Sequence, residues 1–160
     1  MEAVVAVYSD WGIGARGTQP VVLSADRVRF RELTTGCAVI VGRKTLEDFP
    51  GGRPLKNRDN IVVTRQDIEI PGAAAVVHGT GEAIARAEEF GRCFVIGGAS
   101  VFLQFFPHLS RVYVTKLDIA PHSDSFFPNL DEDRGWRLAE SEPRREENGV
   151  GYQFCVYEKI

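Results

Sequence analysis

One stretch constrains the fold more than any other, because it joins a buried strand to a helix through two glycines. Residues 93–96 are apolar, Gly97 and Gly98 follow, and residues 99–106 form a mostly apolar helical segment. A continuous apolar run is typical of a strand buried on both faces of a parallel sheet. Paired glycines at its carboxyl end allow close approaches that a Cβ would block. Ligands of open α/β sheets bind at such junctions, where the free N–H groups of a helix can face an anion.

Other apolar runs predict the elements around this junction. Continuous runs predict strands at residues 3–8, 37–41, 60–63 and 73–77. Helical spacing predicts helices at residues 25–34, 46–49 and 82–90, with Ser24 as an N-cap and Gly91 as a C-cap. The last third alternates apolar and polar residues at 111–117, 136–140 and 153–158, as antiparallel edge strands do.

These elements predict one α/β domain over residues 1–160. We expect a mostly parallel, twisted central sheet of about eight strands, antiparallel C-terminal edge strands and about four flanking helices. Residues 118–128 are expected to form a loop that is ordered by Phe126 and Phe127.

Charge and cysteine content narrow the function classes. The net charge of −3 provides no basic field for nucleic acid or an acidic membrane. The apolar runs are too short to span a bilayer, and no signal peptide is visible, so we expect a cytoplasmic protein. The three cysteines are scattered through apolar runs, which predicts buried free thiols. The three histidines are isolated, so we expect no metal site.

The segment from Gly12 to Gly17 matches the pattern G-x-G-x-x-G after the first strand. A dinucleotide fingerprint opens directly into a helix, whereas Pro20, Val21 and Val22 follow here. The pattern therefore favours a mobile, glycine-rich loop at the end of the strand over a Rossmann site.

Asp26 is a carboxylate on an apolar helix face, because helical spacing places it beside Phe30 and Leu33. One interpretation is a first-turn acid favoured by the helix dipole. The other is a buried carboxylate that pairs with a cationic or donor-rich ligand.

Cations follow two further strands at their carboxyl ends. Gly42-Arg43-Lys44-Thr45 opens the short helix after the second strand, and Thr64-Arg65 ends the next strand. Cations at a helix start oppose its dipole, a conflict that an anionic ligand such as phosphate would remove. A solvated basic turn explains the first group equally well, but the repetition favours a phosphate-bearing ligand.

Taken in order, the motifs resemble those of bacterial dihydrofolate reductases over nearly the full length. The landmarks are Gly12-Ile13-Gly14, Asp26 with Phe30 and Thr34, Gly42-Arg43-Lys44-Thr45, Arg53-Pro54-Leu55 with Arg58 and Asn60, Ile96-Gly97-Gly98, Tyr113 with Thr115, Asp124 with Phe127-Pro128, and Tyr152-Gln153-Phe154. Each motif is short, and the ordered set is specific.

The resemblance implies NADPH as the cofactor, with Thr64 and Arg65 at its 2′-phosphate and His78 near the adenine. It also implies a cis peptide bond between Gly97 and Gly98. The cofactor-binding residues that it implies are Ala6, Ile13, Gly14, Gly17, Thr18, Gly42, Arg43, Lys44, Thr45, Thr64, Arg65, His78, Gly97, Gly98, Ala99, Ser100, Val101 and Phe102.

The same resemblance implies reduction of 7,8-dihydrofolate to tetrahydrofolate, which supplies one-carbon metabolism. A hydride would pass from nicotinamide C4 to pterin C6, with N5 protonated from water. Asp26 would be catalytic and bind the N3 and 2-amino edge of the pterin with support from Thr115, and Arg58 would pair with the α-carboxylate of the glutamate tail. The implied substrate-binding residues are Val4, Val5, Ala6, Leu23, Phe30, Leu55, Arg58, Ile96 and Thr115. Antifolate inhibitors are expected ligands, and a monomer is the expected state.

The chain departs from the family pattern at a few positions. Val21 stands where most members carry a tryptophan whose donor orders water near the pterin. Gln19 and Arg27 replace residues that are commonly apolar, Phe102 replaces a frequent tyrosine, and Ser24 replaces a frequent proline.

Two alternatives remain at this level. The related pyrimidine reductase of riboflavin synthesis shares the fold but lacks an acid corresponding to Asp26. A non-catalytic NADPH-binding module would have no need of Asp26, Arg58 and Thr115 together.

Overall fold

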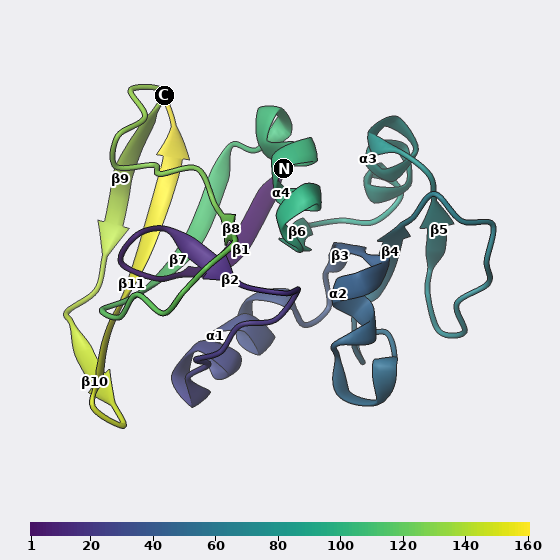
Figure 1. The fold of residues 1–160 in the computed structure, drawn as a ribbon. Helices are drawn as coiled ribbons and strands as arrows, with labels where there is room; N and C mark the ends of the chain where they lie inside the picture. The colour runs from purple at the N-terminus through teal and green to yellow at the C-terminus, as the bar shows by residue number, and fades with distance from the viewer.

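A nine-stranded, mostly parallel sheet runs through the computed structural model, which describes residues 1–160 (Figure 1). The strand order is β10-β11-β7-β1-β6-β3-β4-β5, and β9 pairs with β11. The parallel strands are β1 (Glu2–Val7), β3 (Ala38–Gly42), β4 (Asp59–Val63), β5 (Ala75–Val77), β6 (Cys93–Gly97) and β7 (Arg111–Leu117). The antiparallel strands at the other edge are β9 (Trp136–Ser141), β10 (Arg145–Glu147) and β11 (Val150–Lys159). The predicted architecture is thus confirmed, with one strand more than expected.

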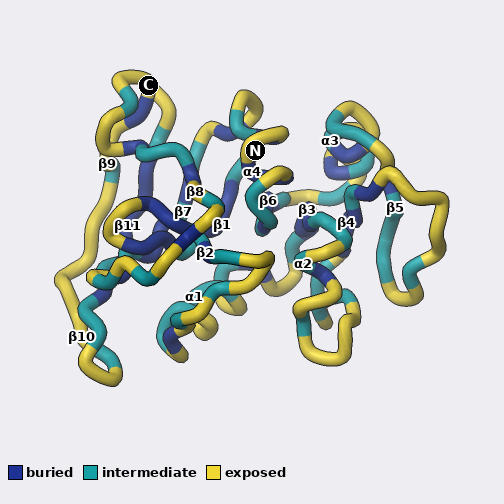
Figure 2. Tube along the Cα trace, viewed as in Figure 1, coloured by how far each residue is buried: buried dark blue, intermediate teal, exposed yellow.

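Four helices cover the two faces of the sheet. They are α1 (Ser24–Thr34), α2 (Arg43–Glu47), α3 (Thr80–Glu88) and α4 (Ala99–Phe105), with short 3-10 turns at Pro50–Gly52 and Phe106–His108. The largest apolar cluster joins α3 and α4 to one face, through side chains such as Ala83, Phe105 and Val95. Leu23, just before α1, and Leu46 of α2 belong to two smaller clusters on the other face. The central strands are the most buried part of the chain (Figure 2).

Several boundaries differ from the prediction. Helix α2 begins at Arg43, not Leu46, and ends at Glu47, because the backbone turns helical directly after Gly42. Helix α3 spans Thr80–Glu88 and ends without a left-handed residue, so the predicted cap at Gly91 is wrong. Strand β5 is shorter than the predicted run from Ala73.

The start of α1 is capped differently from the prediction. Ser24 is the first helical residue, Leu23 occupies the N-cap position, and no side chain of the segment itself caps the helix. The carboxylate of Glu147 on β10 accepts hydrogen bonds from the N–H groups of Ser24 at 2.7 Å and Ala25 at 3.0 Å. A carboxylate satisfies free N–H groups and complements the positive end of the helix dipole. Glu147, more than a hundred residues away in the sequence, therefore caps the helix in place of the Ser24 side chain.

The segment from residue 118 to 128 is not entirely loop. Ser125–Phe126 forms β8, which pairs with β2 (Gly12–Gly14) in a second, two-stranded sheet. Phe127 is fully buried, whereas 48% of Phe126 is exposed, so of the two predicted aromatic anchors only Phe127 packs into the core. All three cysteines are free, but Cys155 alone is fully buried, while Cys37 and Cys93 are partly exposed. None of the helices has the length and apolar character needed to cross a membrane.

Candidate active site

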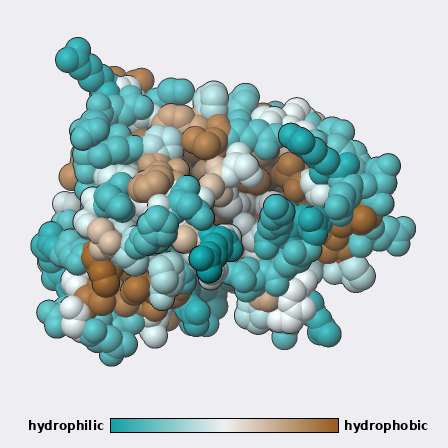
Figure 3. All heavy atoms as spheres, viewed as in Figure 1, coloured by the Kyte–Doolittle hydropathy of each residue, from teal (hydrophilic) through white to brown (hydrophobic).

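The parallel strands bring their carboxyl ends to one edge of the sheet. Ala6 on β1 lies opposite Thr115 on β7, and Val63 at the end of β4 lies opposite Val77 at the end of β5. Residues that follow these strands are therefore neighbours in space although they are far apart in sequence. The face shown in Figure 3 is mostly hydrophilic, with apolar side chains in patches and a hollow near its middle.

Asp26 and Thr115 form the best-defined polar pair at this edge. The hydroxyl of Thr115 donates to Oδ1 of Asp26 at 2.6 Å, across 89 residues of sequence. Thr115 is only 2% exposed, and Asp26 is half-buried in the first turn of α1. Asp26 therefore lies in the first turn, as the first interpretation has it, and it is also partly buried and bonded to Thr115. Its pairing with a ligand stays a prediction.

Burial is the largest influence on the charge of Asp26. It raises the pKa of the carboxyl above its ordinary value, because removal from water disfavours the charged form. The hydrogen bond from Thr115 and the positive charges of Arg29 and Arg27 act in the opposite direction and lower that pKa. A partly buried carboxyl with opposing influences of this kind is a candidate for chemistry.

Arg58 lies beside the same helix. Its Nε donates to Oγ1 of Thr34 at 3.2 Å, its Nη1 donates to the Lys56 carbonyl at 2.9 Å, and its guanidinium lies 5.8 Å from the centre of the Phe30 ring. The predicted substrate residues Phe30 and Arg58 are therefore together. Nearby, the fully buried side chain of Asn60 makes two hydrogen bonds to the backbone of Leu55. Its Oδ1 accepts from the Leu55 N–H at 3.0 Å, and its Nδ2 donates to the Leu55 carbonyl at 2.9 Å.

Not every predicted substrate residue turns its side chain to Asp26. Alternation along β1 places Val5 in the apolar cluster under α3 and α4, on the face opposite α1. Val4 is buried, and Ala6 packs with Leu23 on the α1 side. Ile96 lies with the α2 cluster on that same side.

The loop after β1 is held by its own hydrogen bonds. The hydroxyl of buried Tyr8 both accepts from the Val21 N–H and donates to the Val21 carbonyl, each at 3.2 Å. The side-chain amide of Gln19 donates to the Ala6 carbonyl at 3.2 Å. Asp124 accepts from the Arg16 N–H at 2.9 Å, an interaction that lowers the pKa of Asp124. The Gln19 and Tyr8 contacts have no signal in the sequence, because both depend on how the loop folds back.

Glycines allow the close approach of backbone and helices at the cofactor side. The Gly97–Gly98 peptide bond is cis, as expected from the resemblance. A Cβ on Gly98 would lie 2.7 Å from Oγ1 of Thr45, and one on Gly42 would lie 3.1 Å from a methyl of Val101. In the loop, Gly14 has φ +134°, and a Cβ there would lie 2.4 Å from the Thr18 carbonyl. These positions accept no larger residue without a shift.

The predicted cofactor-binding residues with basic side chains lie at the protein surface. Arg43 and His78 among them already pair with acidic residues of the chain. Arg43 pairs with Glu47 one turn along α2. His78 bonds through Nδ1 with the Thr64 carbonyl at 2.9 Å and through Nε2 with Asp67 at 3.1 Å. Thr64 is buried, while Lys44 and Arg65 are exposed. Val101 and Phe102 are buried in the core, so only their backbone groups can face a ligand. The remaining predicted residues of this set differ in exposure: Ile13 and Ala99 are partly exposed, and Gly17, Thr18 and Ser100 are exposed.

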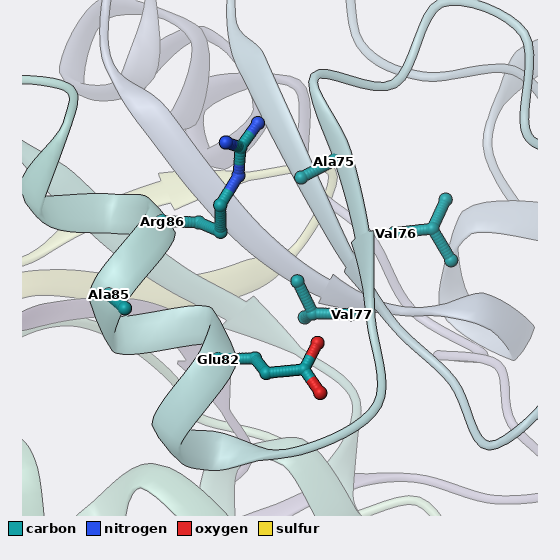
Figure 4. A pocket seen from close by; sticks show the side chains of 6 residues that line it. All are labelled: Ala75, Val76, Val77, Glu82, Ala85 and Arg86. Carbon is teal, nitrogen blue, oxygen red and sulfur yellow. The ribbon is translucent and has the colours of Figure 1, made fainter.

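A separate hollow of about 390 Å³ lies between β5 and α3 (Figure 4). Glu82 and Arg86 reach from α3 toward β5, while Val76 points away from the helix. Arg86 is already engaged with the Ala74 carbonyl at 3.2 Å and with Glu89 at 2.9 Å. Because β5 and β7 lie near opposite edges of the sheet, this hollow is remote from Asp26.

Comparison with known proteins gives consistent results. A family profile described as "Dihydrofolate reductase" matches residues 1–159. The chain is 39% identical to the dihydrofolate reductase of Bacillus subtilis over 150 residues, which cover 92% of this chain and 87% of the relative. It is 35% identical to the dihydrofolate reductase of Neisseria gonorrhoeae, in an alignment that covers 96% of this chain and 94% of the relative. Its structure is similar to that of the dihydrofolate reductase from Enterococcus faecalis complexed with NADP(H) and RAB-propyl, with a TM-score of 0.86, 28% identity and 99% and 95% of the two chains covered.

Proposed function

This chain belongs to the dihydrofolate reductase family, and we propose that it reduces 7,8-dihydrofolate with NADPH at the edge that carries Asp26 and Thr115. Asp26 is the residue to which we assign catalysis. Antifolate inhibitors, which compete for the same edge, are expected ligands. The match over the whole chain favours this activity over the pyrimidine reductase of riboflavin synthesis.

The observation that carries the proposal is the hydrogen bond of 2.6 Å from Thr115 to half-buried Asp26. Thr115 donates to one carboxylate oxygen, so the other acceptor positions remain for a ligand. A pterin edge with a ring N–H and an amino group offers two donors side by side, which a carboxylate accepts in a bidentate manner. The Asp26 charge orients the ring and favours its protonated form as the reaction proceeds.

Arg58 is assigned to the carboxylate of the substrate tail. Its Nε and Nη1 are engaged by Thr34 and the Lys56 carbonyl, which fixes the plane of the guanidinium. The remaining N–H groups can pair with a carboxylate, a role that planar guanidinium geometry suits better than a lysine does. Phe30 lies under this group and offers an apolar contact between the tail and Asp26.

The chemistry of the other half of the edge fits NADPH. Lys44 and Arg65 are exposed cations, and Thr64 and Thr45 place hydroxyl groups nearby. Gly42, Gly97 and Gly98 keep the backbone free of side chains where α2 and α4 begin. When bound, NADPH supplies the hydride that reduces the pterin. The chain itself supplies alignment, a partly dry site and the charge of Asp26.

The loop from Gly12 to Val22 is assigned to closure over the site. Gln19 places a carboxamide on the Ala6 carbonyl, and the nicotinamide ring carries the same chemical group. We therefore expect the cofactor to take the place of the Gln19 amide on Ala6. Loops of this kind exclude water and gate the exchange of ligands. A monomeric state, a cytoplasmic location and the lack of nucleic-acid binding stay predictions.

A direct test follows the oxidation of NADPH in the presence of dihydrofolate for the wild type and Asp26→Asn. We expect turnover by the wild type and a loss of roughly a hundredfold or more in kcat/KM at neutral pH for Asp26→Asn. Glu132→Gln is the matched control, because it neutralises an exposed carboxylate that is not among the proposed site residues. A wild type without turnover at high enzyme concentration would contradict the proposal.

A further inference from the structure

Arg29 occupies an unusual position for an arginine on a surface helix. It lies one turn after Asp26 on α1 and is half-buried, while its neighbours Arg27 and Val28 are exposed. Its Nη1 donates to the carbonyl of Val114 at 3.3 Å. Val114 immediately precedes Thr115 on β7. The guanidinium is thus directed inward, toward the strand that carries the partner of Asp26.

Aromatic rings hold the Arg29 guanidinium in this place. Its centre lies 4.4 Å from the centre of the Phe154 ring on β11 and 5.7 Å from that of Tyr113 on β7. Such stacking favours arginine, whose planar cation is weakly hydrated. The Arg29 guanidinium is therefore held by a hydrogen bond from its edge and by aromatic rings against its face. Arg27 and Arg31 of the same helix are instead exposed to solvent.

The charged and titratable groups around the pair can be named. Asp26 faces Thr115 on β7 and the cations Arg27 and Arg29 on its own helix. Arg29 is attracted by Asp26 and by the carboxylate of Glu142, which follows β9. The other groups facing Arg29 are Cys155 on β11 and Tyr113 on β7, and Arg145 on β10 lies 5.9 Å from the Phe154 ring and 3.3 Å from Glu142.

The two buried charges favour each other's ionised forms. Burial lowers the pKa of Arg29 and raises that of Asp26, whereas their mutual attraction opposes both changes. An arginine remains protonated in a protein even when its pKa falls somewhat. Its charge is therefore constant over the range in which Asp26 titrates.

We propose that Arg29 is a positioning residue that places a fixed, partly buried cation one turn behind Asp26 on α1 and so favours its carboxylate form. Its use in turnover rests on the role of Asp26 proposed above. Arg29 touches neither substrate nor cofactor in this account. It acts through Asp26, and its effect depends on charge rather than on the volume of its side chain.

The test is the titration of the Asp26 carboxyl carbon by NMR in the ligand-free protein, with the signal assigned by its loss in Asp26→Asn. Arg29→Gln removes the charge but can still donate to Val114, and we expect its Asp26 midpoint to move to higher pH. At a fixed pH near the midpoint, the ratio of protonated to ionised Asp26 should rise roughly tenfold. Arg29→Lys keeps the charge, so its midpoint should stay close to that of the wild type.

Arg31→Met is the matched control, because it removes an exposed charge of the same sign from the same helix. Its midpoint should not move. The pH profile of kcat/KM should shift in Arg29→Gln in the same direction as the midpoint. Arg29→Met serves as a second neutral variant if Arg29→Gln does not fold.

An unmoved midpoint in a folded neutral variant, or equal movement in Arg29→Lys and Arg29→Gln, would overturn the role of Arg29. Because the titration needs no substrate, that result would leave the proposed function untouched. Conversely, a wild type without turnover would overturn the proposed function and not this electrostatic role.

Discussion

The substrate side and the cofactor edge of this site are built in different ways. The substrate side, defined as Asp26, Thr115, Arg29, Phe30 and Arg58, has its polar groups bonded to β7, to α1 or to the loop before β4. The cofactor edge, defined as Arg43, Lys44, Thr64, Arg65 and His78, is mostly exposed, and Arg43 and His78 are paired with exposed acids of the chain.

For the proposed site, this difference predicts where each half obtains its affinity for a ligand. The substrate side is fixed before the ligand arrives, so a ligand that matches it loses little free energy to rearrangement. At the cofactor edge, a phosphate must displace Glu47 from Arg43 or bind to cations that are exposed to water. Each such ionic contact contributes little free energy and weakens as salt is added. Binding of the cofactor should therefore depend on salt more strongly than binding of the pterin does.

After the loss of turnover in Asp26→Asn, the next largest kinetic effect is expected at the cofactor edge for Arg65→Ala. Loss of a charge-assisted contact to the 2′-phosphate should raise the KM for NADPH roughly thirtyfold and leave that for NADH nearly unchanged. Steady-state kinetics with both cofactors measure this, and Arg134→Ala is the control for an exposed arginine elsewhere. Equal changes for the two cofactors would remove Arg65 from the phosphate site.

On the substrate side, Thr115→Val should lower kcat/KM for dihydrofolate about tenfold. The substitution keeps the shape of the side chain and removes the 2.6 Å hydrogen bond, so the carboxylate of Asp26 loses a fixed donor. The pKa of Asp26 should rise further, because this bond lowers it. Thr115→Ser keeps the hydroxyl and should retain most activity. A fully active Thr115→Val would show that the preset geometry is dispensable.

Asp26→Asn should stabilise the fold at neutral pH while it abolishes most turnover. Burial raises the pKa of Asp26 in the folded protein, so its contribution to the free energy of unfolding is favourable in acid and is lost as pH rises through the folded pKa. Replacement by a neutral amide should raise the Tm at pH 7 by about 2–4 °C, with a smaller gain near pH 4.

Asp124→Asn is the control with the opposite sign. Hydrogen bonds from the Arg16 N–H and from Ser125 lower the pKa of Asp124, so its stabilising contribution is present above the ordinary aspartate pKa and is lost as pH falls through the folded pKa. Asp124→Asn should therefore lower the Tm at neutral pH. The same sign of Tm change for both variants would contradict the assignment of opposite electrostatic environments.

The smallest effect is expected for Glu47→Gln. Neutralising this acid frees Arg43 to pair with an anion. The Kd for NADPH should therefore fall by about two- to threefold at low salt, and the difference should disappear as salt is added. Calorimetric titration with NADPH measures it. Weaker binding by the variant would show that the Arg43–Glu47 pair positions α2 rather than competing with the cofactor.

The sequence predicted the sheet and its helices because apolar periodicity reports burial directly. The run at residues 93–96 and the glycines after it lie where they were expected, in a central strand at the ligand edge. Short elements escaped prediction, since β2 and β8 pair across more than a hundred residues and have no periodicity of their own. The cap of α1 escaped for the same reason: Glu147 is remote in sequence, and a local rule selected Ser24 instead.

In the site, residue types were predictable and their partners only in part. The resemblance implied Thr115 as the support of Asp26, and the structure places them in contact. Arg29 was not identified, because an arginine on a helix is usually solvated and only the fold brings it against Val114 and Phe154. The Gln19 contact was equally hidden, since a loop conformation has no sequence period.

The contrast between a preset substrate side and an exchanging cofactor edge is tested most directly by a crystal structure with NADPH bound. We predict that the Thr115–Asp26 hydrogen bond stays near its 2.6 Å, while Gln19 leaves the Ala6 carbonyl and Arg43 leaves Glu47. A structure in which the Gln19 and Arg43 contacts persist, or in which Asp26 separates from Thr115 when the cofactor binds, would contradict it.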